Sequence, residues 1–154
     1  MATQSGSEQK RLSLDDLSVG QVFRSGTHTV DAQQIKAFAS QFDPQPFHLD
    51  EEAAKNSFFG ELVASGWHTA GITMRLLVTS TPVDGGVIGA GGEISWPRAT
   101  KPGDTLRVES EVVEIRPSKN RPDRGTVVMR STTYNQNNDP VQIMKSTLVV
   151  FRRK

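Results

Sequence analysis

Asp43 and His48 carry the clearest chemical signal, because a carboxylate and an imidazole can share the work of moving a proton. In a fully extended chain five residues span roughly 16–18 Å, so the pair can act together only if the chain bends back. Pro44 and Pro46 restrict φ and favour such a bend. Two interpretations follow: an acid–base pair that adds or removes water, or a structural loop in which Asp43 caps a turn and His48 fills a surface hollow.

A second chemical feature is the run Ser65-Gly66-Trp67-His68, at the start of a predicted helix. The first N–H groups of a helix have no partner inside it, and Gly66 has no side chain to block access to its own. That N–H can hold a thioester oxygen as negative charge builds there, or Gly66 can simply permit a tight turn into the helix. His68 is a second candidate base, which we interpret as structural because it lies within the helix beside Trp67.

Capping residues and apolar spacing predict the helices that position these groups. Asp31 is a predicted N-cap, and apolar residues follow at helical spacing until Asp43-Pro44, where proline ends the helix. Asp50 is predicted to cap a short second helix. Ser65 is the predicted cap of a third, whose apolar stripe predicts close packing against a flat surface: Trp67, Ala70, Gly71, Met74, Leu77 and Val78.

Strands dominate the remainder of the chain. An extended segment is expected at Gln21–Val30, and the chain after Pro82 has the pattern of strands. Apolar and charged residues alternate over 106–112, as in a half-buried antiparallel strand. β-branched residues fill Thr126–Tyr134 and Val141–Phe151, and the turn residues between them predict a hairpin. The order predicts an α+β domain with a central helix against an antiparallel sheet.

Length and composition limit the class of protein. The 154 residues fit one domain, assigned to 14–154 after a flexible tail at 1–13. A net charge of +1 argues against nucleic-acid binding. The absence of cysteine excludes a cysteine nucleophile and a Cys-based metal site. No apolar run is long enough for a membrane span or a signal peptide, so a cytoplasmic location is expected.

The two chemical features resemble the MaoC-like acyl dehydratases, the (R)-specific enoyl-CoA hydratases of the hydratase 2 type. The segment 42–50, FDPQPFHLD, followed by Ala53, is similar to the family motif Asp-x-Asn-Pro-x-His. The segment 63–69 resembles the stretch that opens the family's central helix. The strand-rich remainder, including 94–97 and 101–104, fits as well, so the resemblance covers the chain from about Leu14 onward. One position departs: the family's Asn, which helps to orient the pair, is Gln45 here.

The resemblance implies a hot-dog fold, in which a curved antiparallel sheet wraps a long central helix, and a homodimer or higher homo-oligomer with sites near the subunit interface. It implies that Asp43 and His48 are the catalytic pair and Gly66 the oxyanion donor. The implied reaction is the reversible hydration of a trans-2-enoyl-CoA to a (R)-3-hydroxyacyl-CoA. No metal and no cofactor are expected, since coenzyme A enters only as part of the substrate.

Six further residues are candidate substrate contacts: Gln45, Ser65, Trp67, Phe58, Arg121 and Arg124. The aromatic ones line an acyl tunnel or belong to the core. The arginines, in the turn 116–125, either meet the phosphates of coenzyme A or lie on a solvated hairpin tip. Two other functions stay open. A hot-dog thioesterase would direct water at the thioester carbonyl, and a non-catalytic acyl-CoA-binding protein would have a degenerate pair, which Gln45 keeps possible.

Overall fold

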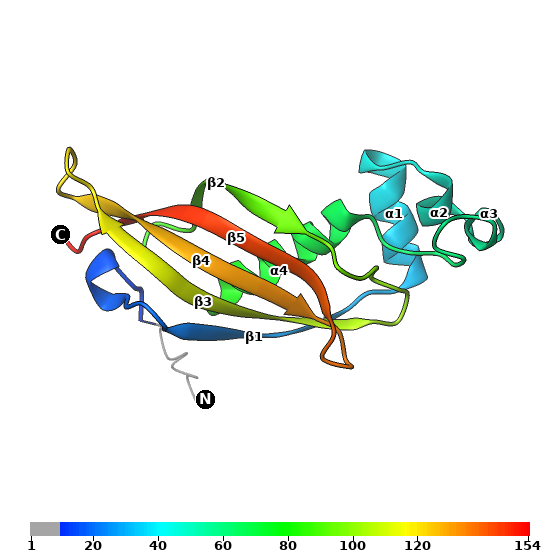
Figure 1. The fold of residues 1–154 in the computed structure, drawn as a ribbon, viewed down its shortest axis with the longest axis horizontal. Helices are drawn as coiled ribbons and strands as arrows, with labels where there is room; N and C mark the ends of the chain where they lie inside the picture. The colour runs from blue at the N-terminus through cyan, green and yellow to red at the C-terminus, as the bar shows by residue number, and fades with distance from the viewer. Residues whose placement is uncertain (1–9) are drawn as a thin grey trace, which may run out of the picture.

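A five-stranded antiparallel sheet in the order β1-β3-β4-β5-β2 forms most of the computed structural model, which describes residues 10–154. The strands are β1 (Val22–Thr29), β2 (Ile88–Ser95), β3 (Thr105–Pro117), β4 (Arg124–Tyr134) and β5 (Pro140–Phe151). The long helix α4 (Gly66–Ser80) lies against one face of the curved sheet (Figure 1). This is the predicted hot-dog arrangement of the α+β class.

Three shorter helices gather at one end of the sheet (Figure 1): α1 (Ala32–Phe42), α2 (Pro46–Leu49) and α3 (Glu51–Lys55). The predicted caps are confirmed, because Asp31 accepts a hydrogen bond from the Gln34 amide and Asp50 one from the Glu52 amide. The segment 43–48, predicted as a loop stiffened by its two prolines, instead contains the start of α2. Proline suits the first turn of a helix, where its missing N–H loses no bond, so Pro46 starts this helix.

The buried face of α4 differs from the predicted one. The residues that pack inward are Thr69, Ile72, Thr73, Leu76 and Leu77, whereas Trp67, Met74 and Val78 of the predicted stripe are exposed. The reason is the pairing of hydroxyls. The Thr73 hydroxyl lies 2.6 Å from that of Thr133 on β4, and the Thr69 hydroxyl donates to Thr100 at 2.9 Å. Threonines satisfied in this way can occupy a core-facing helix surface.

The strand predictions are confirmed in their main features. Leu106, Val108 and Val112 of β3 are buried on one face, and β4 and β5 pair as a hairpin. Strand β2 forms a free edge of the sheet, and a register shift separates Gly89 from Gly91. At Gly92 an added Cβ would lie 2.5 Å from the Lys145 carbonyl oxygen, so only glycine allows β2 to approach β5 this closely.

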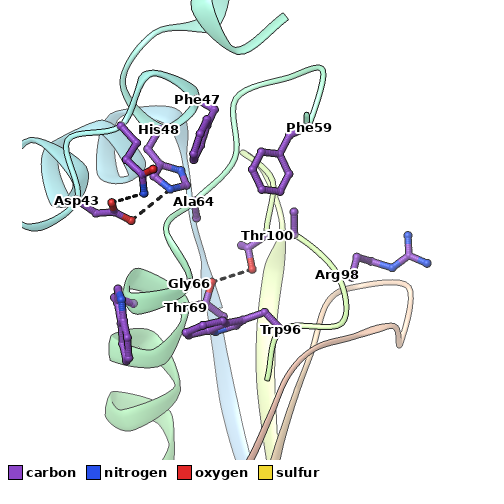
Figure 2. Close-up of a pocket in the computed structure, with 13 residues that line it drawn as sticks. Asp43, Phe47, His48, Phe59, Ala64, Gly66, Thr69, Trp96, Arg98 and Thr100 are labelled. Atoms are coloured by element: carbon purple, nitrogen blue, oxygen red, sulfur yellow. Dashed lines mark hydrogen bonds and ion pairs between the residues drawn. The ribbon is translucent and has the colours of Figure 1, made fainter. Parts of the chain in front are cut away.

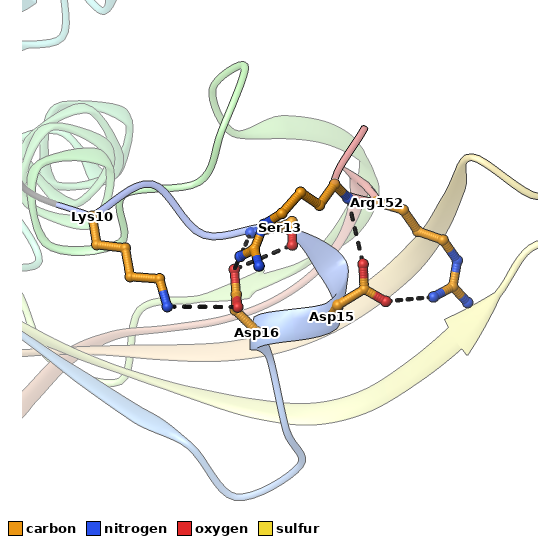
Figure 3. A network of polar contacts seen from close by, with 6 residues as sticks. Lys10, Ser13, Asp15, Asp16 and Arg152 are labelled. Carbon is orange, nitrogen blue, oxygen red and sulfur yellow. Dashed lines mark hydrogen bonds and ion pairs between the residues drawn. The ribbon is translucent and has the colours of Figure 1, made fainter.

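The start of the described chain is packed against the sheet. Of the predicted tail 1–13, residues 1–9 lie outside the described residues. Leu12 forms a bridge with Val83, and Ser13 is buried, so the packed domain begins before residue 14. The short 3₁₀ helix η1 (Leu14–Asp16) follows. Figure 3 shows Asp15 bound to Arg152 and Asp16 facing Lys10 and Ser13, which ties this segment to the C-terminal end of β5.

Candidate active site

The chain bends between Asp43 and His48, as the two prolines predict. Asp43 is the C-cap of α1, and His48 lies one turn into the chain's next helix, α2. Across this bend Asp43 Oδ2 lies 3.3 Å from His48 Nε2 (Figure 2). The backbone closes the bend through a hydrogen bond from the Gln45 amide to the Asp43 carbonyl, 2.8 Å long. The two groups are therefore close enough to contact one water molecule together.

His48 is held in one orientation by the segment that precedes α4. Its side chain is buried, and Nδ1 lies 2.7 Å from the carbonyl oxygen of Val63. A carbonyl only accepts hydrogen bonds, so Nδ1 carries the hydrogen. In the neutral ring Nε2 then bears a free lone pair directed at Asp43. The imidazole thus presents a base to the cavity.

Asp43 is oriented by its neighbours and stays ionised. The Gln45 side-chain amide donates to Asp43 Oδ1 at 2.6 Å and so helps to hold the carboxylate in place. Partial burial raises the pKa of Asp43, but hydrogen bonds from the Ser65 hydroxyl and the Gln45 amide, together with the protonated form of His48, lower it further, and the net pKa is below the usual value. A carboxylate of this kind accepts hydrogen bonds throughout the neutral pH range.

A cavity of about 360 Å³ opens beside the pair. Asp43, Gln45, His48 and Gly66 line it, together with Phe47, Phe59, Trp67, Thr69, Trp96 and Thr100. Figure 2 shows Trp96 beside Gly66 and Thr69, across the cavity from Asp43 and His48. Gly66 begins α4, and among residues 10–154 its amide has no hydrogen-bond acceptor. The cavity therefore combines a base, a carboxylate and a free backbone donor.

The other predicted contacts divide into two groups. Ser65 is fully buried, faces Asp43 with its hydroxyl and caps α4 through the Trp67 amide, and Trp67 lines the cavity. Phe58 was predicted as a contact, but its side chain is 96% exposed and its neighbour Phe59 lines the cavity instead. The reason is the tight turn at 57–60, in which the Phe59 ring packs on Phe47 and turns Phe58 outward.

The turn between β3 and β4, which contains Arg121 and ends at Arg124, lies at the opposite end of the sheet from α1 and α2 (Figure 1). Strand β3 has 13 residues, which at about 3.3 Å per residue is roughly 40 Å. Arg124 is paired with Asp123 at 3.0 Å and lies over the Phe151 ring. Within one chain the structure therefore does not bring these arginines to Asp43 and His48.

His68 is not among the residues that line the cavity. Its ring stacks on Phe38 of α1 at 4.7 Å, and its Nδ1 is buried with no hydrogen-bond partner among residues 10–154. Burial, and secondarily the nearby His28, lowers the pKa of His68. A neutral imidazole between α1 and α4 matches the structural interpretation. Arg98 and Thr100 also line the cavity, and sequence reasoning missed both, because they lie in an irregular segment without a recognisable motif.

A long helix against a curved sheet, with an Asp–His pair beside the helix N-terminus, defines a hot-dog-fold protein with an acid–base site. The sequence matches the MaoC like domain over residues 16–135, so the chain belongs to the MaoC-like dehydratase family. Among the described residues, no three His, Asp or Glu side chains are grouped closely enough to hold a metal ion. Nor does any helix described here have the length and hydropathy that a membrane span needs.

Similar proteins agree with this assignment. The structure of a MaoC-like dehydratase from Rhodospirillum rubrum is 60% identical, with a TM-score of 0.91 over 93% of this chain and 99% of that one. The R-hydratase PhaJ1 from Pseudomonas aeruginosa is 26% identical, with a TM-score of 0.75 over 93% and 88%. A 3-hydroxybutyryl-CoA dehydratase from Methylorubrum extorquens is 29% identical over 117 residues, 74% of this chain and 72% of the relative. The family and these relatives support hydratase or dehydratase activity.

Proposed function

We propose that the protein reversibly hydrates a trans-2-enoyl-CoA to a (R)-3-hydroxyacyl-CoA, without a metal and with coenzyme A only as part of the substrate. The observation that carries the proposal is the 3.3 Å approach of Asp43 Oδ2 to His48 Nε2 in a cavity that also contains the free Gly66 amide. The similarity to an R-hydratase and to a 3-hydroxybutyryl-CoA dehydratase supports the reaction type and the thioester class.

The reacting water is bound between two acceptors. Because the Val63 carbonyl holds the hydrogen of His48 on Nδ1, both Nε2 and the Asp43 carboxylate offer only lone pairs to the cavity. A water molecule can donate one hydrogen to each. Its oxygen attacks the β-carbon while one member of the pair accepts its proton, and a proton is returned to the α-carbon on the same face. General acid–base help of this kind contributes about 10²–10⁴-fold.

The Gly66 amide stabilises the charge that the addition creates. Attack at the β-carbon moves negative charge onto the thioester oxygen, giving an enolate-like state. A free N–H at the start of α4, aided by the helix dipole, can donate to that oxygen. An oxyanion donor of this type contributes about 10²–10³-fold.

We also propose that the protein is at least a homodimer. Strand β2 is a free sheet edge, and Trp67 beside the cavity is 60% exposed. Exposed edges and apolar patches of this kind favour pairing with a second copy. Light scattering after size-exclusion chromatography should give a mass of two chains or a multiple of it, and a monomer at micromolar concentration would contradict the proposal.

The direct test is the loss of enoyl-thioester absorbance after addition of crotonyl-CoA, with chiral analysis of the product. We expect turnover by the wild type and the (R) product. His48→Gln should lose activity, whereas Val19→Ala, an exposed position remote from the cavity, should keep it. Full turnover by His48→Gln would remove this mechanism. Release of free thiol instead of hydration would show a thioesterase.

A further inference from the structure

A second cavity lies on the other side of Trp67 from the catalytic one. It has a volume of about 340 Å³ and lies between α4 and the strands β2 and β5. Its lining is largely apolar and includes Ala70, Met74, Leu77, Ile94, Met144 and Leu148. Trp67 lines both cavities, so its side chain stands between the cavity that holds Asp43 and His48 and a more apolar one.

Trp67 does not form this separation alone. Its ring meets that of Trp96 edge to face, with centroids 5.3 Å apart and an angle of 81° between the planes. This geometry is favourable for an aromatic pair. Trp96 lines the catalytic cavity, and its six-membered ring lies against Gly66, where an added Cβ would be 2.7 Å from the nearest ring atom. The two indoles therefore form a wall directly beside the proposed oxyanion donor.

Gln142 fixes the position of this wall. The Trp96 Nε1–H donates to Gln142 Oε1 at 3.0 Å, and Gln142 is fully buried on β5. The side-chain nitrogen of Gln142 is buried with no hydrogen-bond partner among residues 10–154. A buried amide nitrogen without a hydrogen-bond acceptor destabilises the folded state. The hydrogen bond that the Gln142 oxygen accepts from Trp96 offsets part of this cost. Gln142 thus acts on the cavity through Trp96, as a positioning residue.

We propose that the Trp67–Trp96 pair limits the length of the acyl chain: the wild type accepts short enoyl groups, and removal of either indole opens the apolar second cavity to longer chains. The inference rests on the proposed function, since it concerns the acyl part of the same thioester. The apolar lining suits a hydrocarbon chain, because each buried methylene leaves water. The chain would continue from the reacting carbons past Gly66 into the space between α4 and β2.

The test compares crotonyl-CoA with trans-2-decenoyl-CoA as substrates for the wild type, Trp96→Ala, Trp67→Ala and Gln142→Met. A site that gains or loses room for methylene groups changes selectivity by about 10- to 200-fold per group. We therefore expect either alanine variant to raise the decenoyl-to-crotonyl ratio of kcat/KM by at least about 10-fold. Gln142→Met should raise it less, because the Trp96 ring remains but loses its anchor. Val19→Ala should leave the ratio unchanged.

Binding measurements separate this inference from the proposed reaction. Calorimetry with butanoyl-CoA and decanoyl-CoA, which cannot be hydrated, should show that the wild type prefers the shorter chain and Trp67→Ala the longer. Trp67 is largely exposed, so its replacement tests the wall even if Trp96→Ala does not fold. If Trp67→Ala keeps the chain-length preference of the wild type, the Trp67–Trp96 pair does not limit chain length, and the proposed hydration is unaffected by that result. If Trp67→Ala shows the expected shift in binding but the wild type does not turn over crotonyl-CoA, the role of the indole pair is supported and the proposed reaction is contradicted.

Discussion

At one end of the sheet Asp43 and His48 contact each other beside a cavity, whereas at the other end Arg121 and Arg124 belong to the exposed β3–β4 turn. Both regions are polar clusters near prolines in the sequence. At the helical end each polar group has a partner outside its own segment: Val63 holds His48, and the Ser65 hydroxyl faces Asp43. At the turn the partners are local, as in the pair of Arg124 with the adjacent Asp123.

The origin of the partners distinguishes a reactive cluster from a solvated one. Long-range partners fix side chains in a chosen orientation and remove them from water, which is what acid–base chemistry needs. Local pairs on an exposed turn contribute little and leave the side chains free to move.

The largest loss of activity is expected when Asp43 or His48 is replaced. Asp43→Asn and His48→Gln should each lower kcat/KM for crotonyl-CoA by about 10²–10⁴-fold. Because both hold the same water, the double variant should be little worse than the worse single one. Steady-state kinetics of the three variants provide the measurement. Losses that multiply would show that the two groups act independently.

Gly66→Ala should cost nearly as much. The added methyl group would lie 2.7 Å from the Trp96 ring, so the ring or the start of α4 must shift, and the free amide moves with it. We expect a loss of about 10²–10³-fold in kcat. The double variant Gly66→Ala/Trp96→Ala removes the clash and should recover part of the activity. No recovery would mean that the ring is not what displaces the amide.

A change in pH dependence is expected at Gln45. Its amide is one of the groups that lower the pKa of Asp43, so Gln45→Leu should raise that pKa. The carboxylate is then protonated at a higher pH, and the acid limb of the kcat/KM profile should move toward neutral pH. Gln45→Asn keeps an amide and should shift the limb less. An unmoved limb in Gln45→Leu would show that Asp43 does not govern it.

The smallest effect is expected at the turn. Arg121→Ala combined with Arg124→Ala should change KM for crotonyl-CoA by less than about twofold, because the turn lies at the far end of the sheet from the cavity of the same chain. A clear rise in KM would place the phosphates of coenzyme A at these arginines. In a homodimer that result would also indicate that one chain completes the other's site.

Local patterns predicted most of the fold. Alternation in β3, the caps Asp31 and Asp50 and the β4–β5 turn all concern neighbours in the sequence, where capping and periodicity act. The inward face of α4 could not be predicted in this way. Apolar residues occur on more than one side of that helix, and the choice is made by threonines whose partners are Thr100 and Thr133.

The site was predictable where two residues share a motif. The Asp43–His48 bend follows from proline spacing, and Gly66 from its place at a helix start. The side of the cavity formed by Trp96 and Gln142 was harder to predict from the sequence. Trp96 entered the sequence analysis only within the segment 94–97, and Gln142 was not singled out, since only folding brings β2 and β5 together. Phe58 and Phe59 could not be distinguished from the sequence, because the geometry of one turn decides which of the two rings faces the cavity.

The hydrogen bond from His48 to the Val63 carbonyl has a consequence for tolerance to motion. Val63 stands three residues before Gly66, so the segment that clamps the imidazole is continuous with the one that presents the amide. When α2 moves relative to the sheet, the hydrogen bond should move the segment 63–66 together with the His48 ring. The distance between the His48 imidazole and the Gly66 amide is therefore set by the few peptide units from Val63 to Gly66. Small displacements of the surrounding helices should change that distance little.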